Sequence, residues 1–260
     1  MEFENLIIEA SLKAGAEIME VYQREISVEE KDDKSPLTEA DKRSHIAIQA
    51  ALDTTDIPTL SEEGKQMDYS VRSGWNKFWL VDPLDGTKEF IKKNGEFTVN
   101  IALIENGAPI YGVIYAPVLK KLFVGEVGKG AWIAEGVETN ASVQDIYSNK
   151  ESIPKSKAAE PYIVVASRSH FSPETQEFVD GLKEDKGEIE FTSMGSSLKI
   201  CLVAEGAADI YPRFGPTMEW DTGAGHAIVR AAGKKVIDHT TGEEMRYNKE
   251  NLLNNWFIVQ

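Results

Sequence analysis

A short motif, Asp82-Pro-Leu-Asp-Gly-Thr87, constrains this chain more than any other feature. The apolar run Phe78-Trp-Leu-Val81 comes directly before it and predicts a buried strand. We expect that strand to end at Asp82-Pro83, because proline has no N–H to donate to a neighbouring strand. Two aspartates would then stand together where the strand ends, and the residues from Lys88 to Ile91 could open a helical turn.

The two aspartates and the glycine-threonine step after them indicate a particular chemistry. Carboxylates on one turn can point at one place, where they repel each other unless a cation lies between them. Backbone N–H groups at the start of a helical turn attract an anion. The motif therefore favours a metal ion beside a phosphate. An Asx-Pro turn with a solvated aspartate is the simpler alternative.

The same motif matches the D-P-[IL]-D-G-T signature of the lithium-sensitive, magnesium-dependent phosphatase superfamily that includes the inositol monophosphatases. Leu60-Ser-Glu-Glu-Gly64 resembles the upstream acidic motif of that superfamily, and Glu219-Trp-Asp-Thr-Gly-Ala-Gly225 resembles its downstream motif. Four further segments resemble one subfamily, the CysQ-type 3'(2'),5'-bisphosphate nucleotidases: Lys88 to Phe90, Gly95 to Leu103, Gly195 to Gly206 and Tyr211 to Pro216. The resemblance extends from roughly Leu6 to the C-terminus.

The resemblance implies an α+β fold, a layered α-β-α-β-α sandwich like that of inositol monophosphatase and fructose-1,6-bisphosphatase. The sequence pattern predicts a helix pair and an antiparallel sheet lobe in residues 1–140, with Asn106-Gly107 as a hairpin turn. In residues 141–260 strands alternate with helices, which predicts an α/β lobe. The polar stretch from Asn140 to Glu160 is expected to connect the lobes.

A metal site is also implied by the resemblance. Its ligands are oxygen atoms, from the carboxylates of Glu62, Asp82, Asp85 and Asp221 and the carbonyl of Leu84. Oxygen ligands without cysteine or histidine favour Mg²⁺, with Mn²⁺ as a substitute. Clustered acids favour two or three ions over one. Taken alone, Asp221 would be explained as the N-cap of a helix that begins near Thr222.

The resemblance assigns the attacking water to Asp41 and Thr87. Without it, Asp41 would be a capping-box acid three residues after Thr38, which is the expected N-cap of the second helix. The substrate-binding residues that the resemblance implies are Gly86, Thr87, His170, Ser196, Lys199, Arg213 and Asp221. A second phosphate needs fixed cations, which Lys199 and Arg213 could supply. Either one alone could simply be solvated.

Composition narrows the partners and the compartment. The net charge of −15 argues against a nucleic-acid polymer or an anionic membrane as partner. The single cysteine, Cys201, excludes an intramolecular disulfide and fits a reducing compartment. No apolar run reaches the length of a membrane span, so we expect a cytoplasmic protein. The sequence does not decide the oligomeric state or a peripheral association with the inner membrane.

Together these features predict metal-assisted hydrolysis of a phosphomonoester. The resemblance makes the substrate 3'-phosphoadenosine 5'-phosphate, converted to AMP and phosphate in sulfate assimilation. An inositol monophosphatase-like sugar phosphatase is one alternative, although Lys88-Glu-Phe90 stands where inositol phosphatases usually carry Thr-Asn-Phe. A non-catalytic nucleotide sensor on the same fold is the other. The chain departs from the subfamily at Gly223, where alanine is common, and we expect this to weaken the helix by about 1 kcal/mol at most.

Overall fold

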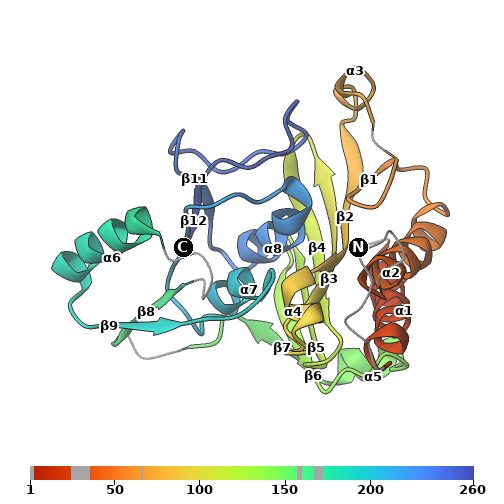
Figure 1. Cartoon of the computed structure of the whole chain (residues 1–260), viewed down its shortest axis with the longest axis horizontal. Helices are drawn as coiled ribbons and strands as arrows, with labels where there is room; N and C mark the ends of the chain where they lie inside the picture. The colour runs from red at the N-terminus through yellow and green to blue at the C-terminus, as the bar shows by residue number, and fades with distance from the viewer. Residues whose placement is uncertain (1–2, 25–35, 66, 157–159, 167–171) are drawn as a thin grey trace.

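A seven-stranded sheet forms the centre of the molecule (Figure 1). The computed structural model describes residues 3–24, 36–65, 67–156, 160–166 and 172–260. The strands follow chain order across the sheet: β1 (Thr59–Ser61), β2 (Lys77–Asp85), β3 (Thr98–Glu105), β4 (Ala108–Ala116), β5 (Lys121–Glu126), β6 (Gly130–Glu135) and β7 (Lys150–Ile153). Only the β1–β2 pair is parallel among them, and the remaining neighbours are antiparallel.

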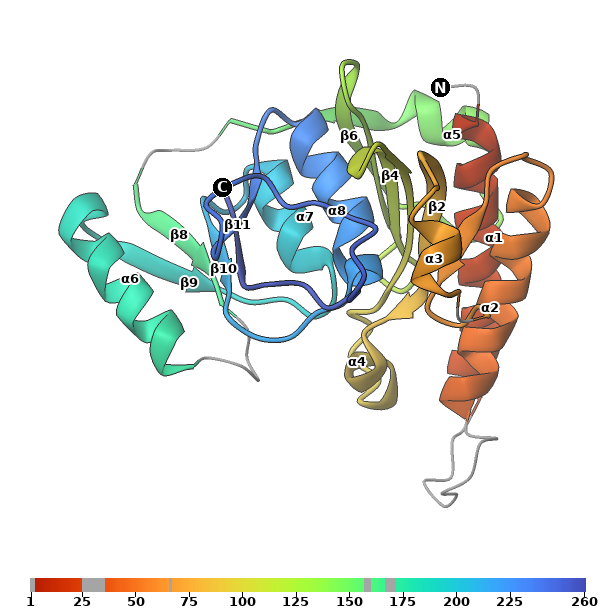
Figure 2. The same cartoon turned by 90° about the horizontal axis from the view of Figure 1, so that it is seen from above.

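Helices cover both faces of this sheet (Figure 2). One face packs against α1 (Glu4–Tyr22) and α2 (Pro36–Leu52), and the other packs against α7 (Leu198–Glu205) and α8 (Glu219–Ala231). Trp79 and Val81 of β2 point into the first core, whereas Phe78 and Leu80 point into the second. Burial on both faces explains why this strand is apolar without alternation.

A second layer of strands lies beyond α7 and α8. It contains an antiparallel sheet of β10 (Tyr211–Arg213), β12 (Phe257–Val259) and β11 (Val236–Asp238), and a parallel pair of β8 (Tyr162–Val165) and β9 (Ile189–Thr192). The helix α6 (Pro173–Lys186) forms the outermost layer (Figure 1). The predicted α-β-α-β-α sandwich is confirmed. The expected Asn106-Gly107 turn is also present, with the positive φ angles of 52° and 74° that a type I′ turn requires.

One predicted strand boundary was wrong. The strand β2 does not end at Asp82-Pro83 but continues to Asp85. Proline is tolerated there because β1 ends at Ser61, opposite Val81, and the pairing with β3 is irregular between the two aspartates. The expected connecting stretch contains a helix, α5 (Val143–Ser148), and β7 of the large sheet. The division of the chain into two lobes stays a prediction.

The helix α8 lies very close to the sheet because two glycines leave room for it. A Cβ on Gly112 of β4 would overlap the carbonyl oxygen of Ala224, and one on Gly125 of β5 would be 2.6 Å from the Cα of Ile228. On the helix side, a Cβ on Gly223 would be 2.7 Å from Cδ2 of Leu80. Gly223 therefore has a packing role that its low helix propensity does not reveal.

The first turn of α8 is fixed by a buried acid. Glu219 has 0% of its surface exposed and accepts backbone N–H groups from Asn248 at 2.7 Å and Lys249 at 3.0 Å. The ammonium group of Lys249 lies 2.6 Å from the same carboxylate. Because a buried charge is tolerated only when it is paired and hydrogen-bonded, these contacts hold the start of α8 in one place. None of the described helices is both long and apolar enough to cross a membrane.

We expect Gly112→Ala to lower the free energy of unfolding by about 1–3 kcal/mol, because the new methyl group overlaps the backbone of α8. Thermal unfolding measures the loss. Gly181→Ala is the matched control: its Cβ would have nothing within 4 Å, and alanine should raise stability by up to about 1 kcal/mol in α6. Unchanged stability of the Gly112 variant would show that α8 lies farther from β4.

Candidate active site

The irregular end of β2 presents the two aspartates of the motif. Asp82 is 1% exposed, and its Oδ1 accepts the backbone N–H of Leu84 at 3.1 Å. Asp85 is half-buried and lies opposite Thr98 of β3. The change of pairing register between the two aspartates turns the strand at this point. The motif is therefore a bent strand end rather than a simple turn after a strand.

Gly86 and Thr87 connect the strand end to the short helix α4 (Thr87–Ile91). Gly86 has a φ of 102°, and a Cβ there would lie 3.1 Å from the Cα of Phe97. Both the backbone angle and the space favour glycine at this position. Thr87 is the first residue of the helix, and its side chain is exposed.

Three other elements bring acids toward β2. Glu62 directly follows β1, the parallel neighbour of β2. Asp41 lies on α2, which is tied to β2 because Ser44 donates its hydroxyl to the carbonyl of Pro83 at 2.7 Å. Asp221 lies in the first turn of α8, where its carboxylate accepts the N–H of Met218 at 2.8 Å.

Two predicted capping roles were wrong. The helix α2 begins at Pro36, so Thr38 lies inside it and Asp41 is in its second turn rather than three residues after an N-cap. The helix α8 begins at Glu219 with Met218 as its N-cap, so Asp221 is the third helical residue. Asp221 nevertheless caps the helix from inside, through the N–H of Met218.

The acids on these elements raise one another's pKa. Burial and then the charges of Glu63 and Glu62 raise the pKa of Asp41 to about 7. Burial and then the charge of Asp85 raise the pKa of Asp221 to about 7. The pKa of Asp82 rises well above its ordinary value, first from burial and then from its acidic neighbours. Burial also raises the pKa of Glu62, although part of its side chain reaches solvent. A bound cation would relieve this repulsion.

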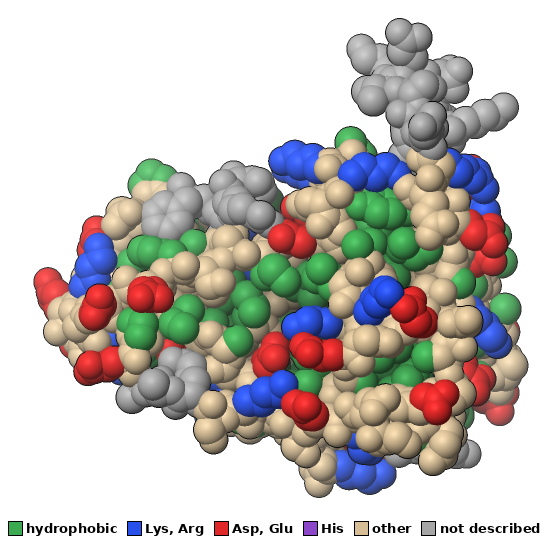
Figure 3. All heavy atoms as spheres, turned by 90° about the horizontal axis from the view of Figure 1, so that it is seen from below, with side chains coloured by type: hydrophobic (Ala, Val, Ile, Leu, Met, Phe, Trp, Pro, Cys, Tyr) green, Lys and Arg blue, Asp and Glu red, His purple; other side chains and the backbone are tan. Residues whose placement is uncertain are grey.

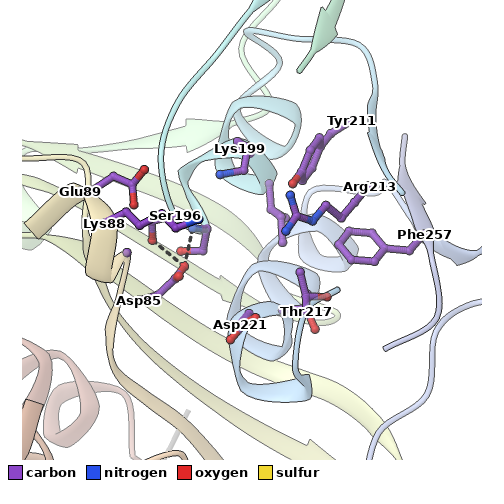
Figure 4. Close-up of a pocket in the computed structure, with 14 residues that line it drawn as sticks. Asp85, Lys88, Glu89, Ser196, Lys199, Tyr211, Arg213, Thr217, Asp221 and Phe257 are labelled. Carbon is purple, nitrogen blue, oxygen red and sulfur yellow. Dashed lines mark hydrogen bonds between the residues drawn. The ribbon is translucent and has the colours of Figure 1, made fainter. Parts of the chain in front are cut away.

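The acids have the right chemistry for a metal ion, but they are not arranged as a complete set of ligands. All the groups are oxygen donors, as hard divalent cations require. In the described part of the chain, no three carboxylate, imidazole or thiol groups are arranged to hold one ion. One reason is that Asp85 turns its Oδ2 toward the start of α7, where it accepts the hydroxyl of Ser196 at 2.5 Å and the N–H of Ser197 at 2.6 Å (Figure 4).

A cavity of about 160 Å³ runs from these acids to two cations (Figure 4). Asp85 and Asp221 line one side, and Lys199 of α7 and Arg213 of β10 line the other. Burial lowers the pKa of Lys199 to about 8, although Asp85 acts against that shift. The guanidinium of Arg213 donates to the carbonyl of Pro216 at 3.0 Å, but its Nε is buried without a hydrogen-bond partner in the described chain. A negatively charged ligand would satisfy both cations.

Comparison with known proteins identifies the family. Residues 1–257 match the sequence model of the inositol monophosphatase family. The chain belongs to that family. Its phosphatases are metal-dependent, in agreement with the acid cluster. Solved inositol monophosphatases include one from Staphylococcus aureus, inositol monophosphatase-II, with a TM-score of 0.74 at 19% identity over 100% of this chain and 91% of that one. That likeness shows the common fold.

More similar relatives come from one branch of the inositol monophosphatase family. A protein of Salmonella typhimurium named 3'(2'),5'-bisphosphate nucleotidase CysQ is 49% identical over 259 residues, which cover 97% of each chain. Its namesake in Escherichia coli K12 is 48% identical over the same shares. The crystal structure of CysQ from Bacteroides thetaiotaomicron has a TM-score of 0.91 at 54% identity and covers 98% of this chain and 95% of that chain.

The fold gathers most of the predicted site residues of this inositol monophosphatase family member around one cavity. Asp85, Gly86, Ser196, Lys199, Arg213 and Asp221 line it directly. Asp41, Glu62 and Asp82 belong to the adjoining acid cluster, as their mutual effects on pKa show. His170 lies outside the described residues.

Sequence reasoning missed the polar residues Thr98 and Asn100 and the aromatic lining residues Tyr211 and Phe257. A signal for the first pair was available. Thr98 and Asn100 interrupt an apolar strand at alternate positions, so both must face the same side of the sheet. Polar side chains on a buried strand face need partners there.

We expect Asp82→Asn to raise the melting temperature of the metal-free protein by about 2–8 °C, because it removes a buried charge that neighbouring acids repel, at a gain of about 1–2 kcal/mol. The gain should be largest above pH 7 and shrink below it, since protonation of carboxyls whose pKa is raised to about 7 removes the same repulsion. The rise in melting temperature that Mg²⁺ causes should be smaller in Asp82→Asn than in the wild type. Asp185→Asn, an exposed position on α6, is the charge-matched control. A lower melting temperature for Asp82→Asn would contradict the repulsion.

Proposed function

We propose that this protein is a Mg²⁺-dependent 3'(2'),5'-bisphosphate nucleotidase, which hydrolyses 3'-phosphoadenosine 5'-phosphate to AMP and phosphate. The observation that carries the proposal is the cavity with an acid cluster at one side and two cations at the other. A nucleoside bisphosphate has two phosphates, one for each side. The names of relatives that are 48–49% identical over nearly the whole chain support 3'(2'),5'-bisphosphate nucleotides as the substrate class.

The acid cluster would hold the metal ions. Glu62, Asp82, Asp85 and Asp221, with the carbonyl of Leu84, supply only oxygen atoms, which favours two or three Mg²⁺ ions with Mn²⁺ as a substitute. When bound, the ions would lower the pKa of water and offset the negative charge of the phosphate. In this arrangement Asp85 must give up at least part of its contact with α7 to face the other acids.

The attacking water and the reacting phosphate would be positioned by residues around the motif. Asp41 reaches the cluster from α2, and Thr87 stands at the start of α4, so a water between them would be held from two sides. The left-handed backbone of Gly86 allows the chain to turn there without a side chain in the way of the phosphate. Hydrolysis then needs no covalent intermediate on the protein.

The second phosphate would be bound by the cations. Lys199 is nearly surrounded by protein yet lies across the cavity from Asp85, and Arg213 has a free N–H in the described structure. A phosphate oxygen accepts strongly from both groups. Ser196, Asp221 and His170 complete the substrate-binding set that we propose.

The remaining proposals concern the cellular setting. A small nucleotide is the proposed partner, rather than a nucleic-acid polymer. On the face drawn in Figure 3, the described basic side chains are interspersed with acidic ones and form no continuous basic stripe. We place the activity in the cytoplasm and in sulfate assimilation, where the product nucleotide would be recycled. The buried thiol of Cys201, whose pKa burial raises, fits a structural residue.

The proposed function is tested by phosphate release with Mg²⁺, comparing 3'-phosphoadenosine 5'-phosphate with inositol 1-phosphate. We expect a strong preference for the nucleotide and loss of activity with Li⁺. Preference for the inositol ester would support a sugar phosphatase instead. Binding of the nucleotide without hydrolysis would support a sensor.

We expect Asp85→Asn to abolish turnover with little loss of folding, because the amide keeps the size of the side chain but removes a charge shared by the metal ions. Phosphate release and thermal unfolding are measured on the same sample. Wild-type turnover in this variant would refute the metal assignment.

We expect Lys199→Ala and Arg213→Ala each to raise KM for the bisphosphate nucleotide by at least about tenfold, with a much smaller effect on a simple phosphomonoester. The reason is that only the bisphosphate has a group for these cations. Steady-state kinetics with both substrates measure the difference. An equal rise in KM for both substrates would contradict the assignment of Lys199 and Arg213 to the second phosphate.

A further inference from the structure

A buried network of polar groups lies directly behind Asp85. Thr98 and Asn100 of β3 are 0% and 1% exposed. The hydroxyl of Thr98 is 2.6 Å from that of Ser196, 2.8 Å from that of Ser197 and 2.9 Å from Oδ1 of Asn100. The network therefore joins the large sheet to the start of α7, which in turn holds Asp85.

The hydroxyl of Ser196 has two neighbouring acceptors and only one proton. It lies 2.5 Å from Oδ2 of Asp85 and 2.6 Å from Oγ1 of Thr98. In the present arrangement the carboxylate is the stronger acceptor, because it is charged. If Asp85 turned away, Thr98 could accept the same proton without movement of the backbone. The hydroxyl of Ser196, which is half-buried at the cavity wall, would otherwise lose its acceptor.

Asn100 complements this arrangement on the other side. Its Oδ1 accepts the hydroxyls of Thr98 and Ser197 at 2.9 Å each, whereas its Nδ2 is buried without a hydrogen-bond partner in the described structure. Burial raises the pKa of Asp85, and this amide is one of the neighbouring groups that act against that shift. An N–H donor without a partner in the described structure therefore lies on β3, opposite the end of β2 that carries Asp85.

We propose that Thr98 and Asn100 are positioning residues that help Asp85 to pass from the start of α7 to the metal site. Thr98 takes over the hydroxyl of Ser196, and Asn100 donates its free N–H to Asp85. The inference rests on the proposed function, since it assumes that Asp85 binds a metal ion. It accounts for the absence of three converging ligands among the described side chains while Asp85 is held by α7.

The transfer would connect the two sides of the cavity. The helix α7 carries Lys199, one of the two cations, and its first turn is what holds Asp85 in the present arrangement. Metal binding at Asp85 would therefore loosen the contact between the acid cluster and this helix. The substrate-binding side and the metal-binding side would then adjust together rather than independently.

The test is Mg²⁺ binding by calorimetry, which does not depend on turnover. Thr98→Val keeps the shape of the side chain but removes the acceptor for Ser196. We expect it to raise the Kd for Mg²⁺ about tenfold, which is the effect of leaving one hydrogen-bond donor without an acceptor. Thr98→Ser keeps the hydroxyl and should bind Mg²⁺ as the wild type does.

A double-mutant cycle with Ser196→Ala separates this role from a general loss of packing. Ser196→Ala alone removes the group that holds Asp85, so its Kd for Mg²⁺ should equal or fall below the wild-type value. In the Ser196→Ala background, Thr98→Val should then have almost no effect. Ser11→Ala, which removes a buried hydroxyl from α1, is the control and should leave Mg²⁺ binding unchanged.

Two outcomes would overturn the inference alone. One is wild-type Mg²⁺ affinity in Thr98→Val, and the other is a tenfold loss that persists in the Ser196→Ala background. If Thr98→Val does not fold, Ser196→Ala still decides, because weaker Mg²⁺ binding in that variant contradicts the proposal. A wild-type protein that binds no Mg²⁺ and releases no phosphate would refute the proposed function as well.

Discussion

The close contact between α8 and the large sheet determines where the site can form. Gly112 and Gly125 let the helix backbone approach the strands, and buried Glu219 fixes its first turn. Asp221 is two residues farther along, so its position depends on the same contacts. Its distance from Asp85 therefore depends on backbone packing, which is stiffer than any single side chain. A catalytic constellation of charges needs that kind of support.

The site brings several carboxylates together at the end of a strand that is otherwise apolar and buried. The strand β2 is buried on both faces, yet it ends in two aspartates that lie near acids from α2, from the residue after β1 and from α8. Burial, and then the charges of neighbouring acids, raise the pKa of these groups, so the charged forms are disfavoured in the folded state. The large apolar cores on either side of the sheet allow the protein to tolerate this cost.

Sequence patterns correctly predicted those elements of the fold that depend on neighbouring residues alone. The apolar period gave α1 almost to the residue, and Asn106-Gly107 gave the hairpin. The rule for proline failed at Pro83, because it applies only where a neighbouring strand needs the N–H. The predicted N-caps Thr38 and Asp221 were wrong, because α2 begins at Pro36 and α8 at Glu219, so both residues lie inside their helices. Family motifs indicated the acids, but nothing local showed that Thr98 and Ser196 would meet from positions 98 residues apart.

The order of the site residues along the chain also determines when the site can form during synthesis. During synthesis from the N-terminus, the strand that carries Asp82 and Asp85 emerges long before Asp221. Glu219 finds its partners only when Asn248 and Lys249 have appeared. Until then, one face of the sheet lacks the helix that covers it. A growing chain would therefore have little ability to capture metal ions, and the capacity to do so would arise only as the last helix docks.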